Sequence, residues 1–379
     1  SDTTKSYTMT VSDGTTDQIF TDVLAGEVWL LSGQSNMQTP VNAYMDTSIN
    51  GNIRSLGEGA ASYSGKIRYF SQAHSYSSAE KQEVRRGTWL ECNNANVWNF
   101  SATGYMFARK LHDLLNVPVG LVYAAQGATG IQTWMSNETL HTDSAVAERA
   151  FEQNSSARGS QGKSPSYFYN AMIAPIKGIT LGGILWYQGE SNAADGAFYE
   201  TLLKTHISGM RNDFYSGADL PFVFMQLAPY SGIDFTQVRE SMRKVSEEVS
   251  NTAMAVQIDS APESNNPAPI HPYNKALVGE RLARAAFVCA YGGERAKNLS
   301  PSFASAVKDG ERLIVTLKDT SGELSTLDSE ACTAFMIAGE DGAFYPADCE
   351  IIDGSHVALT SSDVAEPRFV RYAWGAQTV

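Results

Sequence analysis

Short apolar runs alternate with segments of helical periodicity from Glu27 to about residue 290. The apolar runs include "VWLLS", "VGLVYAAQG", "GGILWYQGE" and "FVFMQLAP", and the helical segments include "TGYMFARKLHDLLN" and "KALVGERLARAAFV". Continuous apolar strands separated by amphipathic helices are typical of a parallel sheet that is covered on both faces, because each strand is then buried on both sides. The pattern predicts a three-layer α/β fold.

The two ends of the chain have a different texture. Residues 1–22 contain the alternating, turn-rich stretch "KSYTMTVSDGTT", which is typical of one or two strands. After about residue 300 the sequence consists of short alternating runs such as "RLIVTLKD" and "SHVALTSSD", divided by Gly and Asp turns. We therefore expect an N-terminal β segment over residues 1–22, a main α/β domain over 23–299 and a small antiparallel β-module over 300–379.

Composition excludes several classes of function. The formal net charge of −13 makes nucleic acid a poor partner. No apolar run approaches the roughly 18 residues that a membrane span needs. The four cysteines contain no Cys-x-x-Cys pair, so we expect no metal site. Cys332 and Cys349 lie in two strand-like runs, where they form either a disulfide across neighbouring strands or two half-buried thiols.

Three junctions between a strand and a loop are candidates for a site, because ligands collect at the carboxyl edge of such sheets. In "GEVWLLSGQSNM", Gly33 allows a tight turn and Ser35 is a candidate nucleophile. The alternative is an ordinary turn in which Ser35 or Asn36 caps a helix. In "YAAQGATGIQTW", a backbone N–H of Gly127 or Gly130 could contribute to an oxyanion hole.

The third junction, "LWYQGESN", carries Gln188, Glu190 and Asn192, whose side chains either serve an oxyanion or belong to a polar loop with a helix cap. A nucleophilic serine also needs a base. Among six histidines, His271 stands out because it follows a polar loop and opens the helical segment "IHPYNKALVGERLARAAF". A wide separation from Ser35 is normal, because the fold and not the sequence assembles such groups.

Four of these motifs together resemble a known family. "GEVWLLSGQSNM", "GATGIQTWMS", "WYQGESN" and "IHPYNK", in this order, are similar to the sialate O-acetylesterases of the SGNH hydrolase type, and "FMIAGEDGAFYPA" and "VRYAW" extend the likeness into the C-terminal module. The resemblance covers nearly the whole chain from about Asp22. It implies a flavodoxin-like, parallel-sheet hydrolase core that removes acetyl groups from sugar hydroxyls without a cofactor.

The resemblance also implies roles by position. Ser35 would be the nucleophile and His271 the general base. The oxyanion hole would consist of the Ser35 N–H, a Gly127 N–H and the Gln188 side chain, which we favour over Asn192. Possible supporting residues are Gln34, Glu190, Asn192, Asp259 and Glu263.

One departure concerns the third member of a triad. Relatives often place an aspartate two or three positions before the histidine, where this chain has Pro269 and Ala268. We expect Asp259 to be structural, and Glu263 would reach His271 only if the loop doubles back. We therefore predict a Ser-His dyad, in which a backbone carbonyl of residues 265–270 holds the Nδ1–H and fixes the tautomer.

Substrate and partners follow from the same resemblance. The first expectation is O-acetylated sialic acid, whose carboxylate could be bound by one of three unplaced arginines, Arg68, Arg85 and Arg86. The nearest rival is a deacetylase of acetyl-xylan or another glycan.

A rival of another class is an inactive carbohydrate-binding protein, whose sugar-stacking rings would be Trp29, Trp98, Trp134 and Trp186, although tryptophans beside strands are more often core. The oligomeric state is open. The start at Ser1, without a signal-peptide pattern, indicates a processed or trimmed chain and does not itself decide export. We expect an exported protein, whether secreted, periplasmic or at the cell surface.

Overall fold

A seven-stranded sheet forms the centre of the protein. The computed structural model describes residues 2–44, 57–156, 164–214, 217–259, 270–326 and 330–375. The strand order is β5-β4-β6-β3-β7-β8-β9, and every strand is parallel to its neighbours except the edge strand β5. The bounds are β3 Glu27–Gly33, β4 Ile67–Ser71, β5 Thr88–Glu91, β6 Val119–Ala125, β7 Gly183–Tyr187, β8 Phe222–Met225 and β9 Thr252–Ala255.

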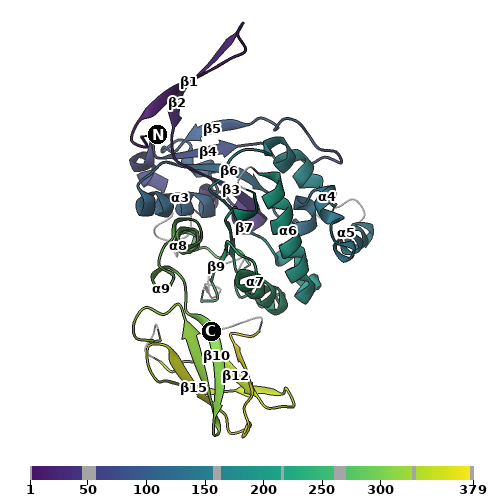
Figure 1. The fold of residues 1–379 in the computed structure, drawn as a ribbon, viewed down its shortest axis with the longest axis vertical. Helices are drawn as coiled ribbons and strands as arrows, with labels where there is room; N and C mark the ends of the chain where they lie inside the picture. The colour runs from purple at the N-terminus through teal and green to yellow at the C-terminus, as the bar shows by residue number, and fades with distance from the viewer. Residues whose placement is uncertain are drawn as a thin grey trace.

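Helices pack around this sheet (Figure 1). Helix α3 packs against α8, and α6 packs against α7. The α-helices are α1 Ser35–Gln38, α3 Ala102–Leu115, α4 Asn137–Leu140, α5 Ser144–Ser156, α6 Tyr199–Asp213, α7 Thr236–Glu248, α8 Lys275–Tyr291 and α9 Arg295–Asn298. Shorter 3-10 or π turns are η1 Val41–Tyr44, η3 Gly59–Tyr63, η4 Val97–Asn99, η5 Ile131–Trp134, η6 Tyr169–Ile173, η7 Ala174–Ile176, η8 Glu190–Phe198 and η9 Gly217–Asp219. The predicted α/β fold with a parallel sheet is confirmed.

Local signals in the sequence set the limits of α8, which carries part of the site. The helix begins after Asn274, whose side chain accepts a hydrogen bond from the Leu277 N–H, and it ends at Gly292 in the left-handed conformation, with φ 73°. A Cβ on Gly279 would lie 2.4 Å from the Cβ of Met106 in α3. Glycine at this position therefore lets α8 pack closely on α3.

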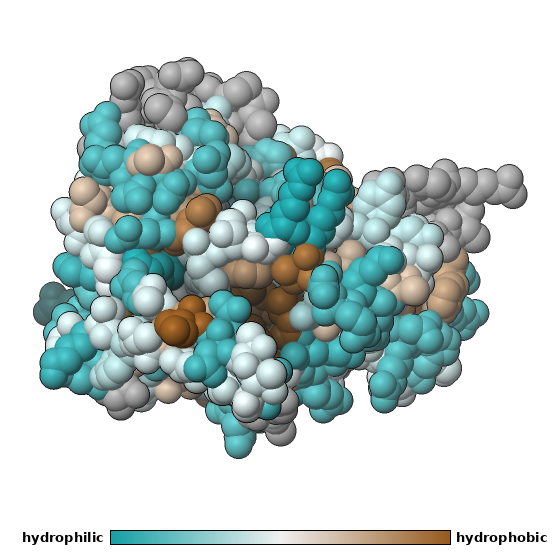
Figure 2. All heavy atoms as spheres, turned by 90° about the horizontal axis from the view of Figure 1, so that it is seen from above, coloured by the Kyte–Doolittle hydropathy of each residue, from teal (hydrophilic) through white to brown (hydrophobic). Residues whose placement is uncertain are grey.

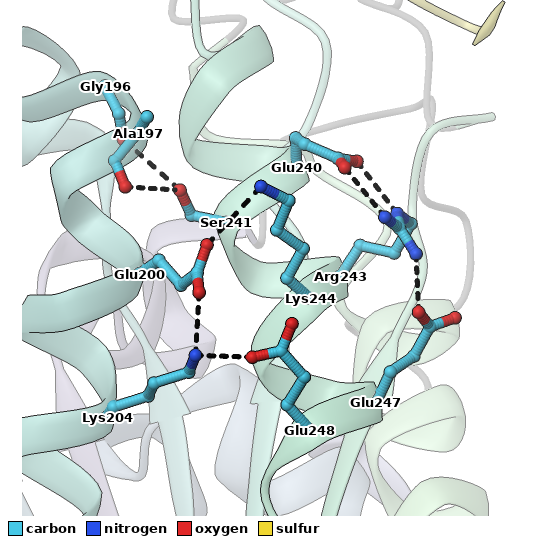
Figure 3. A network of polar contacts seen from close by, with 10 residues as sticks. All are labelled: Gly196, Ala197, Glu200, Lys204, Glu240, Ser241, Arg243, Lys244, Glu247 and Glu248. Atoms are coloured by element: carbon cyan, nitrogen blue, oxygen red, sulfur yellow. Dashed lines mark hydrogen bonds and ion pairs between the residues drawn. The ribbon is translucent and has the colours of Figure 1, made fainter. Parts of the chain in front are cut away.

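Charged side chains join α6 to α7 on the surface (Figure 3). Lys204 binds Glu200 at 2.7 Å and Glu248 at 2.5 Å, and these bonds raise the pKa of Lys204. Such exposed pairs contribute little stability each. More relevant to the site, the Ser241 hydroxyl of α7 donates to the backbone carbonyl of Gly196 at 3.3 Å and so ties α7 to η8.

The N-terminal residues form a hairpin that projects from the body (Figure 1). Its strands, β1 Ser6–Ser12 and β2 Asp17–Leu24, are antiparallel and almost entirely exposed. An ion pair of 2.5 Å between Asp22 and Arg68 of β4 links the end of the hairpin to the sheet. This pairing also places Arg68, one of the arginines proposed for substrate binding, in a structural contact.

The C-terminal residues form two small antiparallel sheets with their own apolar core. One has the order β10-β11-β15-β14 and the other β13-β12-β16. The two sheets share this core, and Leu313, Ile337 and Leu359 are buried in it. The bounds are β10 Ser302–Asp309, β11 Arg312–Lys318, β12 Phe335–Ala338, β13 Phe344–Pro346, β14 Asp348–Ile351, β15 His356–Thr360 and β16 Phe369–Tyr372. The domain limits at residues 22 and 299 stay a prediction.

Cys332 and Cys349 lie beside each other in this C-terminal part as free thiols, which is the second of the two alternatives predicted for them. Burial raises the pKa of Cys349 to about 12. The Cys349 thiol is therefore protonated at neutral pH.

Most of the surface in Figure 2 is hydrophilic, and hydrophobic side chains gather in a hollow near the centre of the view. Within the described ranges, no helix combines the length and the apolar character that crossing a membrane requires.

Candidate active site

Ser35 lies at the carboxyl end of the central strand β3. A Cβ on Gly33 would lie 2.2 Å from the backbone oxygen of Tyr187 in β7, and Gly33 has a φ of 134°, so only glycine fits here. The Gln34 N–H donates to the same Tyr187 oxygen at 2.9 Å. Two buried neighbouring strands thus fix the turn that presents Ser35, which is itself partly exposed.

His271 lies directly against Ser35. The Nε2 of His271 is 2.9 Å from the Ser35 Oγ, although 236 positions separate the two residues. Burial, and then the positive charge of Lys275, lower the pKa of His271 below its usual value. The imidazole is therefore neutral at neutral pH, which is the state in which it can accept a proton from a hydroxyl.

Asp259 belongs to a different contact. Its two carboxylate oxygens each bind the Arg281 guanidinium at 2.6 Å, and this bond holds the pKa of Asp259 below its usual range. The structure gives Asp259 no contact with His271. Glu263 and residues 265–269 lie outside the described residues, so the carbonyl that we expect to hold the Nδ1–H stays a prediction.

Gly127 lies beside the candidate nucleophile, as the sequence predicted. A Cβ on Gly127 would be 3.4 Å from the Ser35 Cβ. Its N–H donates to the Gln38 Oε1 at 2.5 Å, so this side chain must move before Gly127 can donate to an oxyanion. The Ser35 N–H has no acceptor among the described residues.

Gln188 does not fit the role predicted for it. Its Nε2 donates to the Thr129 carbonyl at 3.0 Å and to the Asn192 Oδ1 at 2.6 Å, while its Oε1 accepts from the Tyr199 hydroxyl at 2.9 Å. The side chain is fully buried, and its two amide hydrogens both have acceptors. Gln188 therefore braces the loop after β7, and the prediction that it donates to an oxyanion is corrected.

Asn192 is likewise part of this brace. Its Oδ1 also accepts from the Ile131 N–H at 2.9 Å, and its Nδ2 donates to the Asp195 carboxylate at 2.8 Å. Asn192 thereby joins η8 to η5, the turn that follows the Gly127 loop. Gln34, another predicted supporting residue, accepts from the Ser191 N–H at 3.2 Å and joins the β3 and β7 loops.

Asn36 connects the three segments that build the site. Its Nδ2 donates to the Glu190 Oε1 at 2.7 Å and to the Ile270 carbonyl at 3.0 Å, and its Oδ1 accepts from the Lys275 Nζ at 2.6 Å. The side chains of Asn36 and Lys275 are buried. Asn36, which follows Ser35 in the sequence, is therefore hydrogen-bonded to Ile270, which precedes His271.

This network was not predicted from the sequence, where Asn36 was considered only as a helix cap and Lys275 was not considered. A lysine one turn after His271, at the buried start of a helix, was the available signal. Glu190, which the sequence predicted as a supporting residue, is part of the network around Asn36. Burial raises its pKa, and its Oε2 has no hydrogen-bond partner within the described residues.

Burial limits the tryptophans that were proposed from the sequence as sugar-stacking rings. Three of the four tryptophans proposed as sugar-stacking rings, Trp29, Trp134 and Trp186, are fully buried in the core, and Trp98 is half-buried. His206 is buried against Trp186, and burial lowers its pKa to about 3. The described part of the chain contains no group of three or more His, Cys, Asp or Glu residues that could hold a metal ion.

The chain is similar to known carbohydrate esterases. A family model described as carbohydrate esterase, sialic acid-specific acetylesterase, matches residues 25–288, which is more than half of the chain. The chain belongs to this family. The resemblance stated from the sequence motifs is thereby confirmed.

Two sialate O-acetylesterases illustrate the relation to the acetylesterase family. The protein from Mus musculus is 31% identical over 318 residues, which cover 72% of this chain and 58% of the mouse protein. The protein from Homo sapiens is 31% identical over 293 residues, which cover 72% of this chain and 54% of the human protein. The chain thus spans little more than half the length of these relatives.

The solved structure of a carbohydrate acetylesterase from Xanthomonas citri is also similar, with a TM-score of 0.83 and 31% identity. The match covers 98% of this chain and 80% of that one. Ser35, Gly127 and His271 all lie within the residues that the acetylesterase family model matches, whereas the C-terminal β-module lies beyond them.

Proposed function

We propose that the protein is a carbohydrate O-acetylesterase that forms an acyl-enzyme on Ser35 and acts on O-acetylated sialic acid. The observation that carries the proposal is the 2.9 Å contact between the Ser35 Oγ and the His271 Nε2 at the carboxyl edge of the sheet. Membership of the acetylesterase family supports the carbohydrate ester as the substrate class. The names of the relatives from mouse and human support sialic acid.

The reaction that we propose has two halves. His271 takes the proton of the Ser35 hydroxyl as the Oγ attacks the acetyl carbonyl, and the protonated imidazole then gives that proton to the departing sugar oxygen. A water molecule, deprotonated by the same imidazole, attacks the acetyl-Ser35 ester. The imidazolium then returns the proton to the Ser35 Oγ as the ester bond breaks and acetate is released. The N–H groups of Ser35 and Gly127 stabilise the negative oxygen in both halves, and each such donor typically contributes about 2.7 to 4 kcal/mol to lowering the barrier.

The Gln38 side chain has to leave the Gly127 N–H for this hole to form. We propose that the substrate carbonyl oxygen replaces the Gln38 Oε1, which now binds that N–H at 2.5 Å. In this proposal Asp259 does not orient His271, because the Asp259 carboxylate is bound to Arg281.

The nucleophile is tested by Ser35→Ala with p-nitrophenyl acetate, and the matched control is Ser305→Ala, an exposed serine of β10. We expect Ser35→Ala to lose at least a thousandfold in kcat, with an unchanged fold, and the control to keep its activity. Near-normal turnover by folded Ser35→Ala would refute the assignment. Glycan binding by a parent protein that deacetylates nothing would instead favour the inactive carbohydrate-binding alternative.

The sugar is tested separately. A second candidate, a deacetylase of acetyl-xylan or another glycan, is favoured by the similarity to the Xanthomonas citri protein, which is described only as a carbohydrate acetylesterase. We expect a higher kcat/KM on 9-O-acetylated sialic acid than on acetylated xylo-oligosaccharide. The reverse order would keep the esterase proposal and replace its substrate.

A further inference from the structure

A line of contacts leads from Ser35 to His74, which lies two residues before one of a pair of aromatic rings. Gly127 lies against Ser35 and donates to Gln38, and the Gln38 Nε2 is 3.5 Å from the His74 Nε2. The His74 Nδ1 lies within hydrogen-bonding distance of the Gln126 Oε1. These residues all follow the carboxyl ends of the neighbouring strands β3, β4 and β6.

Tyr76 follows His74 by two residues in a segment without helix or turn. Tyr76 is therefore close in sequence to the end of this line of contacts. Its ring is parallel to that of Tyr167, with an interplanar angle of 1° and a centroid distance of 6.3 Å. Tyr76 is 49% exposed, and Tyr167 is half-buried.

The pair stands on a rigid base. Phe168 contacts the Tyr76 ring at a centroid distance of 6.3 Å and stacks on the fully buried Trp134 at 5.3 Å. The Ser77 N–H donates to the Tyr167 carbonyl at 3.0 Å, and the Asn170 Nδ2 donates to the Ser77 carbonyl at 3.1 Å. Two segments that are about 90 residues apart are thus held in one fixed arrangement, which lowers the entropy cost of binding.

The hydroxyl groups of Tyr76 and Tyr167 differ from those of the buried tyrosines in their hydrogen bonding. The hydroxyls of Tyr123, Tyr199 and Tyr291 each donate to a protein oxygen, whereas neither Tyr76 nor Tyr167 has a hydrogen-bond partner for its hydroxyl among the described residues. An exposed ring with an unused hydroxyl offers an apolar face and a polar edge at low entropy cost. A sugar ring, with one C–H face and hydroxyls at its edge, presents the complementary surface.

We propose that Tyr76 and Tyr167 form a platform for a sugar ring of the acetylated substrate, with His74 and Gln126 facing its hydroxyls. The inference rests on the proposed function, because it places the acetyl group at Ser35 and the sugar on the side of β4. It assigns recognition of the sugar to this segment and not to the tryptophans of the core.

The experiment compares an ester that carries a sugar with one that does not. Tyr76→Ala and Tyr167→Ala are assayed with an acetylated glycan and with p-nitrophenyl acetate, and the control is Phe151→Ala, a 44% exposed aromatic residue of α5. We expect KM for the glycan to rise about tenfold in each tyrosine variant, and kcat/KM for p-nitrophenyl acetate to change by less than about twofold. Tyr76→Phe should keep most of the affinity, because it keeps the ring.

Equal losses on both esters, or no loss on the glycan, would overturn the platform. A binding measurement separates this outcome from failure of the proposed function. In protein that carries Ser35→Ala, we expect added Tyr76→Ala to weaken binding of the acetylated glycan about tenfold, and unchanged binding overturns the inference. If Ser35→Ala instead keeps esterase activity, the proposed function fails while the platform can still pass this binding test.

Discussion

Removal of the Asn36 side chain is the perturbation for which the structure gives the clearest magnitude. Asn36→Ala deletes one acceptor and one donor group that together serve Lys275, Glu190 and the Ile270 carbonyl. All of these contacts lie in a buried region that joins the Ser35 loop to the start of α8. The variant therefore measures what this network contributes to stability and to kcat while Ser35 and His271 are both kept.

The expected loss follows from the three hydrogen bonds. A bond to a charged group contributes about 1.5 to 3 kcal/mol and a neutral one about 1 kcal/mol, so the three sum to about 4 to 7 kcal/mol. Water can enter the space left by the amide and replace part of this, which leaves an expected decrease of about 3 to 5 kcal/mol in the free energy of unfolding. Because Ile270 precedes His271, we also expect a loss of about a hundredfold in kcat.

The assay is urea denaturation followed by tryptophan fluorescence, together with kcat for p-nitrophenyl acetate under folding conditions. The control is Asn298→Ala, which removes an exposed hydrogen bond to the Glu294 carbonyl and a long one, 3.4 Å, from Arg284, and should cost about 1 kcal/mol. An Asn36→Ala protein with the stability of its parent, or with more than half of its kcat, would refute the reasoning.

Four further predictions concern charge. Burial and Lys275 lower the pKa of His271, and activity needs the neutral imidazole, so kcat/KM should fall on the acid side with a midpoint below pH 6.5. Lys275→Gln should move this midpoint to higher pH, and a shift to lower pH would contradict it. Asp259→Asn should keep most of the activity, since its partner is Arg281, whereas a thousandfold loss would indicate a triad. Arg85 is exposed, and its carbonyl accepts a hydrogen bond from the N–H of Ala73, the residue before His74. In steady-state assays on both glycans, we expect Arg85→Gln to raise KM about tenfold for acetylated sialic acid only.

The fold and the candidate pair of Ser35 and His271 could be proposed from the sequence because they depend on patterns that are local in sequence. Apolar runs of strand length and amphipathic helices determine a parallel sheet, and the carboxyl ends of its strands meet at one edge. Ser35 and Gly127 follow two neighbouring strands, so their proximity did not require knowledge of the complete topology. His271 was found from its place at the start of a helix together with the family motif.

The hydrogen-bond partners of the amide side chains could not be predicted in this way. Gln188 has the right position for an oxyanion donor, yet Thr129, from the loop after β6, and Tyr199, at the start of α6, take up its polar groups. Likewise, nothing in a single motif indicates that Asn36 would bind Lys275, because 239 positions separate them. Such contacts depend on how loops pack, and many arrangements satisfy the same sequence pattern.

The central claim, an acetyl ester on Ser35, is tested most directly by mass spectrometry of protein quenched with acid during turnover of p-nitrophenyl acetate. The account predicts a peptide containing Ser35 that carries the mass of one acetyl group, and no such peptide in Ser35→Ala. An acetyl group found on another residue, or turnover without any acetylated peptide when release of acetate is shown to be rate-limiting, would contradict it.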